Sequence, residues 1–346
     1  MYNTIIVGAG QAGLSTGYYL AKQTDNFLIL EKGNEVGLAW KERYDSLILF
    51  TSKQFSSLPG LKIDGKPNTL PTKEEIYHYL KRYALNFSLP IKLNTEVSKI
   101  EKTGEHYSVF TNGNTYITKN VIIPTGPFHH PNIPSFVKNL SPDVLQLHSS
   151  EYKNPNQLKE GNVLVVGGGN SGAQIAVELA ETRETFISIS QKLKYMPLTI
   201  GERSIFWWFD KTGILKASTN SWLGQKIQSK RDPIFGYELK DAISKNKIKV
   251  VDRVIDSKNK SLLFKNNRAL EIQNIIWATG FKPNYRIVNN IHGLLDRSGR
   301  PIHDRGVTNS EGLLFIGLPW QSRRGSALLE GVGYDAEYLM KYIRRG

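Results

Sequence analysis

The sequence IIVGAGQAGLSTGYYLA, residues 5–21, begins with apolar residues, passes through a glycine-rich turn and continues in helix-forming residues. The same order recurs in VLVVGGGNSGAQIAVELA, residues 163–180. Both stretches contain the spacing GxGxxG, with glycines at Gly8, Gly10, Gly13, Gly167, Gly169 and Gly172. Between a strand and a helix this pattern is a dinucleotide-binding fingerprint, because the glycines permit a tight turn and let the backbone approach a pyrophosphate. Two copies predict two dinucleotides.

The chain has 346 residues, enough for two domains that each bury a core. It contains no cysteine, which excludes a dithiol relay, a structural disulfide and a thiolate metal site. This separates it from disulfide reductases, which share the two-dinucleotide architecture but need a redox-active cysteine pair. The seven histidines lack the spacing of metal ligands, so we expect no metal.

The formal net charge of +14 comes from 45 basic and 31 acidic residues. The basic residues are scattered and no nucleic-acid motif accompanies them, so phosphorylated cofactors explain the charge better than a nucleic acid does. No apolar stretch approaches the roughly 18 residues of a membrane span, and no secretory leader is recognisable. We therefore expect a cytoplasmic protein with no nucleic-acid partner and no stable membrane insertion.

The alternation of apolar runs and turns predicts an α/β fold of two Rossmann-like domains, one inserted into the other. We expect the first domain at 1–155 and 280–346 and the second at 156–279. Sequence rich in proline between 124 and 155 is typical of a linker.

In the first domain a helix is predicted over 73–86, because its apolar residues recur at helical spacing. Thr72 is the expected N-cap and Glu75 occupies the capping-box position. Strands are predicted over 91–100, 107–111 and 116–123.

An aromatic insert at 196–239 interrupts the second domain and contains Phe206, Trp207, Trp208 and Phe209 in a row. A contiguous apolar patch usually marks an interface, so a homodimer contact is the favoured interpretation. A substrate-side lid or a membrane-touching element is the alternative.

The position 18 residues after the last glycine of each fingerprint distinguishes the two cofactors. It is Glu31 in the first copy and Ser190 in the second. A carboxylate accepts bonds from ribose hydroxyls but repels a 2′-phosphate. We therefore expect FAD at the first site, with Glu31 and the adjacent Lys32. Ser190, Gln191 and Lys192 favour NADPH at the second site, with NADH as the alternative.

Seven stretches carry a family resemblance: GAGQAG (8–13), VGLAWKERYDSLILFTSKQFSSLPG (36–60), PTGPFHHPNIP (124–134), HSSEYK (148–153), VVGGGNSGAQIAVELA (165–180), IIWATGFKPN (275–284) and GLLFIGLP (312–319). In these the chain resembles the class B flavoprotein monooxygenases of the flavin-containing type, and most closely the small bacterial CzcO-like oxidoreductases. The matches follow the family order over nearly the whole chain.

The resemblance implies site residues. Ala39 and Trp40 match positions beside the flavin ring, and Thr51 matches a position near the isoalloxazine. Val97 matches a backbone contact to adenine, and Gly317 matches the close approach to the ribityl chain and phosphate. The other implied cofactor contacts are Gln11, Ala12, Gly126, Asn170, Ser171, Gln174, Thr279 and Gly280.

Two departures from the family pattern bear on activity. The family motif around His148 and Tyr152 lacks its Phe and Gly, although Tyr152 favours the flavin-containing type over the Baeyer-Villiger type. Phe50 replaces an asparagine found in many relatives, and a phenyl ring can neither donate nor accept a hydrogen bond. Stabilisation of an oxygenated flavin is therefore in question.

The predicted reaction is hydride transfer from NAD(P)H to FAD, followed by reaction of the reduced flavin with O₂ to a C4a-peroxyflavin. That species would oxygenate a small soft nucleophile, a sulfide or an amine, or a ketone. The alternative is an NAD(P)H oxidase, or a reductase of a quinone or metal complex, without oxygen insertion. A nucleotide-binding sensor is a third and less favoured class. No catalytic residue is assigned with certainty, and only Phe50 and Thr51 are expected near the flavin.

Overall fold

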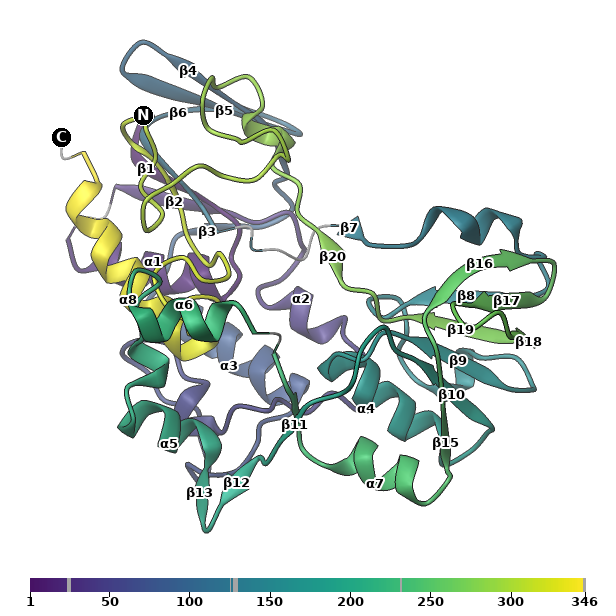
Figure 1. The fold of residues 1–346 in the computed structure, drawn as a ribbon. Helices are drawn as coiled ribbons and strands as arrows, with labels where there is room; N and C mark the ends of the chain where they lie inside the picture. The colour runs from purple at the N-terminus through teal and green to yellow at the C-terminus, as the bar shows by residue number, and fades with distance from the viewer. Residues whose placement is uncertain (24–25, 125, 127–129, 231, 345–346) are drawn as a thin grey trace.

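The computed structural model of the protein describes residues 1–23, 26–124, 126, 130–230 and 232–344. Over these residues the chain builds two sheet-based units that lie side by side (Figure 1). The N-terminal fingerprint belongs to one unit and the second fingerprint to the other.

The first sheet has the strand order β3-β2-β1-β6-β5-β4, and β21 pairs with the second half of β6. Its bounds are β1 Tyr2–Val7, β2 Phe27–Leu30, β3 Ile91–Lys92, β4 Val97–Thr103, β5 His106–Thr111, β6 Thr115–Ile123 and β21 Leu313–Phe315. The strands β3, β2, β1, β6 and β21 run parallel, whereas β4, β5 and β6 form an antiparallel meander. The carboxyl ends of the parallel strands share one edge, where such sheets bind ligands.

The second sheet is parallel throughout the described residues, with the order β15-β10-β9-β19-β8. Its bounds are β8 Leu145–His148, β9 Val163–Val166, β10 Thr185–Ser188, β15 Ile248–Val251 and β19 Asn274–Trp277. A small antiparallel sheet follows it, made of β16 Val254–Lys258, β17 Ser261–Phe264 and β18 Ala269–Glu271. Strands β9, β10 and β19 are buried along their length, as expected for a parallel sheet covered on both faces.

Three helices cover the first sheet and share one apolar cluster with it: α1 Gln11–Ala21, α3 Lys73–Asn86 and α8 Leu329–Leu339. The second sheet carries α4 Asn170–Leu179 and α7 Glu238–Ser244. The predicted capping box is confirmed: the Thr72 hydroxyl accepts from the Glu75 N–H at 3.2 Å, and the Glu75 carboxylate accepts from the Thr72 N–H at 2.9 Å. The 3-10 turns are Lys53–Phe55, Ser135–Asn139, Pro155–Gln157, Ile214–Lys216, Arg286–Val288 and Met340–Tyr342.

Two predicted strands are confirmed as β5 and β6, but the strand expected over 91–100 is wrong as a single element. The chain turns at Asn94, whose φ of +51° lies in the left-handed region, and so divides the segment into β3 and β4. The pattern of apolar residues does not report backbone angles, so it could not show this turn. Asparagine is one of the few residues besides glycine that adopt the left-handed conformation.

The chain passes between the units twice, and the two crossings pair with each other. Strand β7, His130–Pro131, runs antiparallel to β20, Phe281–Lys282. Strand β8 already belongs to the second sheet, because it pairs with β19. We therefore propose domain boundaries at β7 and β20, earlier than the expected boundary at 155.

The aromatic insert leaves the second unit and packs on the first. It contains β11 Tyr195–Met196, β12 Thr199–Ile200, β13 Arg203–Ser204, α5 Ile205–Lys211, α6 Trp222–Gln228 and β14 Ile234–Phe235. Figure 1 shows α5 and α6 on the side of α8. Phe206 is 1% exposed and Phe209 is also buried, so two of the four consecutive aromatic residues fill an internal cluster rather than a surface patch. Trp208 and Trp222 remain 40% and 73% exposed.

Candidate cofactor site

The first fingerprint is a tight turn between β1 and α1. Gly8 has a φ of +118°, which glycine adopts without the strain of a side chain. A Cβ on Gly13 would lie 1.9 Å from the Gly8 carbonyl oxygen, so the helix can approach the strand only with glycine there. A Cβ on Gly10 would meet no atom within 4 Å. The turn is therefore packed tightly at Gly13, whereas the space next to Gly10 is free of described protein atoms.

The second fingerprint repeats this geometry between β9 and α4. Gly167 has a φ of +124°, and a Cβ on Gly172 would lie 2.0 Å from the Gly167 carbonyl oxygen. A Cβ on Gly169 would again meet nothing within 4 Å. Two stretches far apart in the sequence thus form the same cradle.

Both cradles suit a phosphate. Gly10 and Gly169 are N-caps with no side-chain cap, and neither first turn contains an acidic residue. The backbone N–H groups of a helix N-terminus attract an anion, and here no side chain competes for them. Ala12, which follows Gln11 in the first turn, is buried under the turn. The residues present therefore fit two dinucleotides.

Glu31 closes the first fingerprint from the end of β2. Its carboxylate accepts from the Ala9 N–H at 2.6 Å and from the Gly33 N–H at 2.8 Å, while Lys32 points into solvent. A carboxylate oriented by two backbone donors stands beside the turn, where a ribose would follow the pyrophosphate.

The corresponding end of β10 contains no carboxylate. Ser190, Gln191 and Lys192 are all exposed after β10, beside the second fingerprint. One positive and two neutral side chains therefore lie where the first site has Glu31.

The loop between β21 and α8 covers the start of α1. Gly317 is buried with a φ of +79°, and a Cβ there would come within 3.0 Å of the Ala12 Cβ. The Gln11 amide donates to the Ala327 carbonyl at 2.8 Å, just before α8 begins at Leu329. The structure therefore brings Gln11, Ala12 and Gly317 together, although Gly317 is distant in sequence.

The other residues expected near the flavin lie around this unit. Trp40, on the short helix α2 Leu38–Lys41, packs on the core of the first domain, whereas Ala39 is exposed. Val97 begins β4 and packs in the cluster on the opposite face of the sheet. Thr51 is buried and its hydroxyl is paired with the Ser56 hydroxyl at 2.7 Å.

Two of the three residues expected at the second pyrophosphate turn also join the two domains. The Gln174 amide donates to the Ile48 carbonyl at 2.9 Å and accepts from the Tyr44 hydroxyl at 2.9 Å. Ser171 hydrogen-bonds the same hydroxyl, and burial raises the pKa of Tyr44 to about 12. Asn170 instead anchors the insert: its side-chain oxygen accepts from the Phe235 N–H at 2.9 Å. Sequence reasoning missed Tyr44, because a lone tyrosine carries no recognisable pattern.

The crossings between the domains are tied by side chains. Thr279 donates its hydroxyl to the Asn132 carbonyl at 2.6 Å, and Gly280 accepts from His148 Nε2 at 3.0 Å. Burial lowers the pKa of His148. Gly126, at the other crossing, has a φ of +62°, whereas its neighbour Thr125 is outside the described residues.

The second residue of the family motif has a structural contact. Tyr152 is buried and donates to the Glu178 carboxylate in α4 at 2.8 Å. Burial, with a smaller contribution from Glu178, raises the pKa of Tyr152. Tyr152 thus fastens the segment after β8 to the helix that follows the second fingerprint.

A stack of phenyl rings lies between the two fingerprints. Phe50 stacks on Phe235 with ring centroids 4.7 Å apart and on Phe206 at 5.9 Å. Phe235 is held by Asn170 of the second fingerprint, and Leu328, next to the carbonyl that Gln11 contacts, packs in the same cluster. Of these rings, the sequence associated only Phe50 with the site. Phe206 and Phe235 belong to the insert, and its sequence does not indicate that it packs against the first domain.

Fold and site together define an oxidoreductase with two dinucleotide sites. The chain belongs to the pyridine nucleotide-disulphide oxidoreductase family, whose pattern matches residues 5–194. It is 57% identical to the "Uncharacterized oxidoreductase CzcO" of Bacillus subtilis (strain 168), with 99% of each chain covered. It is 29% identical to the "Probable indole-3-pyruvate monooxygenase YUCCA3" of Arabidopsis thaliana, covering 94% of this chain and 84% of the relative.

Among solved structures, the flavin-containing monooxygenase from Stenotrophomonas maltophilia has the same fold, with a TM-score of 0.83, 24% identity and coverage of 99% and 98%. The resemblance and the two-domain α/β fold are therefore confirmed. The protein is an oxidoreductase of a family that binds FAD and NAD(P), which confirms both cofactor classes. The family name refers to disulphides, but this chain has no cysteine to form one.

Within the part of the chain that the structure describes, every helix is too short or too polar to cross a membrane. Among the same residues, no three histidine, aspartate or glutamate side chains converge as metal ligands.

Proposed function

We propose that the protein is an FAD-dependent monooxygenase that oxidises NAD(P)H and oxygenates a small soft nucleophile, a sulfide or an amine, or a ketone. The observation that carries this is the pair of open helix N-termini on two domains fastened together by Gln174. Such a site between domains can hold two dinucleotides in mutual reach. The description of YUCCA3 and of the Stenotrophomonas enzyme as monooxygenases supports the reaction type.

FAD is assigned to the first fingerprint and NADPH to the second. Glu31 suits the unphosphorylated ribose of FAD, and its absence at Ser190 removes the repulsion that a 2′-phosphate would meet. Lys192 supplies a nearby positive charge, although as a point charge rather than a bidentate clamp. NADH is the alternative donor.

The protein's part in the reaction is to bind, orient and exclude water. The N-termini of α1 and α4 bind phosphates, and the Gln174 contacts fix the distance between the domains. The stack of Phe50, Phe206 and Phe235 presents an apolar wall beside both fingerprints. Bound FAD supplies the redox chemistry, accepting hydride and activating O₂.

A second function is favoured by Phe50 and Thr51. The Phe50 ring offers no hydrogen bond, and the Thr51 hydroxyl is already engaged with Ser56. Two side chains that offer the flavin no free donor suit an NAD(P)H oxidase, or a reductase that passes electrons to a quinone or metal complex.

Product analysis separates the two functions. Purified enzyme with NADPH is mixed with small sulfides, amines and ketones, and oxygenated product and hydrogen peroxide are measured together. A monooxygenase forms product in proportion to NADPH consumed with at least one class of substrate. Peroxide alone with all three classes would establish the oxidase or reductase instead.

Light scattering in the same samples tests the expected homodimer, for which Trp208 and Trp222 are the exposed candidates.

A further inference from the structure

The loop 318–328 joins β21 to α8, and its two flanks touch the first fingerprint. Gly317, at one end, lies against Ala12, and Ala327, at the other, accepts from the Gln11 amide. The position of this loop therefore decides how the chain closes over the N-terminus of α1.

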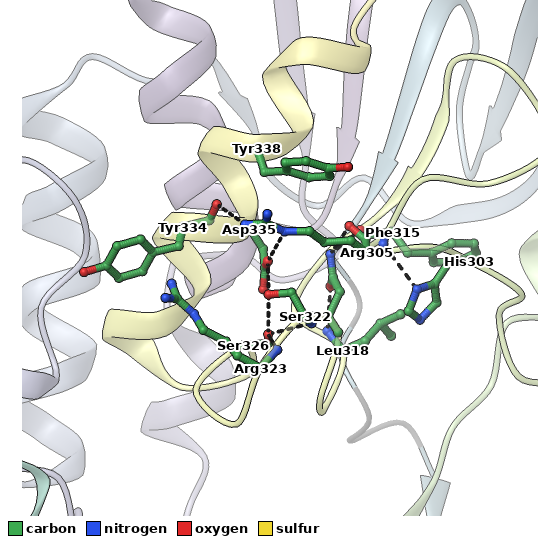
Figure 2. Close-up of polar contacts among 12 residues, drawn as sticks. His303, Arg305, Phe315, Leu318, Ser322, Arg323, Ser326, Tyr334, Asp335 and Tyr338 are labelled. Carbon is green, nitrogen blue, oxygen red and sulfur yellow. Dashed lines mark hydrogen bonds and ion pairs between the residues drawn. The ribbon is translucent and has the colours of Figure 1, made fainter. Parts of the chain in front are cut away.

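A buried carboxylate of α8 holds the middle of this loop (Figure 2). Asp335, in α8, is 0% exposed. Its Oδ1 accepts from the Ser322 hydroxyl at 2.5 Å and from Arg305 Nε at 3.2 Å, while Oδ2 has no hydrogen-bond partner among the residues that the structure describes. Arg305 is itself partly exposed and lies over the Tyr338 ring at 3.9 Å.

Two further buried side chains shape the loop itself. Ser326 accepts from the Ser322 N–H at 3.0 Å and from the Arg323 N–H at 3.2 Å. Gln321 accepts from the Leu318 N–H at 3.2 Å. The Ser326 bonds lie within the loop, whereas the Gln321 amide also donates to the Arg305 and Phe315 carbonyls. The hydrogen bond from Ser322 to Asp335 attaches this part of the loop to α8, and beside it the Arg323 guanidinium lies over the Tyr334 ring of α8 at 3.7 Å.

Ser322 also meets the insert. Its carbonyl accepts from the Thr219 N–H at 3.0 Å, and the bridge between Ser218 and Arg323 lies beside this bond. One residue is thus held on one side by α8 and on the other by the segment that extends from the second domain.

A buried carboxylate with one unpartnered oxygen is a costly group to retain, because its desolvation is not fully compensated. An apolar side chain would fill a core-facing position of α8 more favourably. We propose that Asp335 is a positioning residue for the first dinucleotide: through Ser322 it sets the loop 318–328, and so places Gly317 and Ala327 against α1. This rests on the proposed assignment of FAD to the first fingerprint.

The test measures FAD release from the holoenzyme, by the rise in flavin fluorescence on dilution, together with the thermal midpoint and the visible spectrum of bound flavin. Ser322→Ala removes the bond to Asp335 and is expected to raise the FAD dissociation constant about tenfold, the factor that one charge-assisted bond is worth. Ser322→Thr keeps a hydroxyl and is expected to retain FAD. Asp335→Ala deletes the same bond. The double variant Ser322→Ala/Asp335→Ala should therefore release FAD no faster than whichever single variant releases it faster.

Ser257→Ala is the matched control, since Ser257 is a buried serine of the second domain that donates to the Phe136 carbonyl at 2.7 Å. It is expected to change the midpoint but not the FAD affinity. Wild-type FAD affinity in Ser322→Ala, or equal FAD loss in Ser257→Ala, would overturn the positioning role alone. A wild-type protein that takes up no FAD would instead refute the proposed function. If Asp335→Ala does not fold, the Ser322→Ala and Ser322→Thr pair decides the result.

Discussion

The middle glycines of the two fingerprints allow the cofactor assignment to be tested without disturbing the fold. Gly10 and Gly169 have φ values of −75° and −89° with extended ψ, which alanine adopts freely. An added Cβ would meet no protein atom within 4 Å at either position. Gly10→Ala and Gly169→Ala are therefore expected to fold normally, with stability raised by about 0.4–1 kcal/mol through the unfolded chain.

Their effect on binding should be large. The added methyl occupies the space through which a pyrophosphate reaches the backbone N–H groups of the following helix. Loss of two hydrogen bonds to a charged group, at about 1.5–3 kcal/mol each, gives at least about 3 kcal/mol. That corresponds to a dissociation constant more than about 100-fold higher.

The assay compares bound flavin after gel filtration, the NADPH dissociation constant by titration, and thermal unfolding. Gly10→Ala should lose FAD, whereas Gly169→Ala should keep FAD and lose NADPH affinity. Gly13→Ala is the contrasting control, because its Cβ would lie 1.9 Å from the Gly8 carbonyl and the fold itself should suffer. The assignment is refuted if Gly10→Ala retains FAD within about threefold of wild type, or if Gly169→Ala is the variant that loses flavin.

Three other predictions address the stack, the crossing and the cofactor preference. Phe50→Ala should lower the free energy of unfolding by about 2 kcal/mol. This loss is smaller than that for a fully buried ring, because Phe50 is half-buried. An unchanged urea midpoint would show that the stack does not hold the insert. His148 donates Nε2–H to Gly280 and accepts from Ser150 at Nδ1, and burial lowers its pKa, so the folded state resists its protonation. Stability should be full above about pH 6.5 and fall below it; His148→Gln should flatten this decline in thermal melts, and an equally steep decline would contradict the prediction. Lys192→Glu should weaken NADPH about tenfold and leave NADH unchanged, since only the former carries a 2′-phosphate; equal loss of both would remove Lys192 from the site.

Short-range patterns predicted much of this structure. The two fingerprints form the same cradle because the spacing of their glycines acts over a single turn of chain. The capping box of α3 likewise joins residues three positions apart. Glu31 was identifiable because helix α1, a short connection and strand β2 fix its distance from the fingerprint. In each case the determining contacts lie within one β-α-β segment or within the first turn of one helix.

Longer-range features could not be derived in the same way. The segment expected as one strand over 91–100 divides at Asn94, and strand β8 joins the second sheet rather than the first. The four consecutive aromatic residues of the insert suggested one surface patch, yet Phe206 and Phe209 are buried within the chain. A run of apolar residues indicates that the segment is buried, but it does not indicate which part of the protein packs against it.

The sequence by itself determined that this chain has two dinucleotide turns and that only the first carries a carboxylate beside it, because these properties depend on neighbours in the chain. The tertiary structure decided what lies between the turns: Phe50 stacks on Phe235 of the insert, and Asp335 holds Ser322 in the loop over α1. These contacts arise when the insert, the loop and α8 pack together and water is expelled. The burial and the long sequence separations that create them leave no trace in local periodicity.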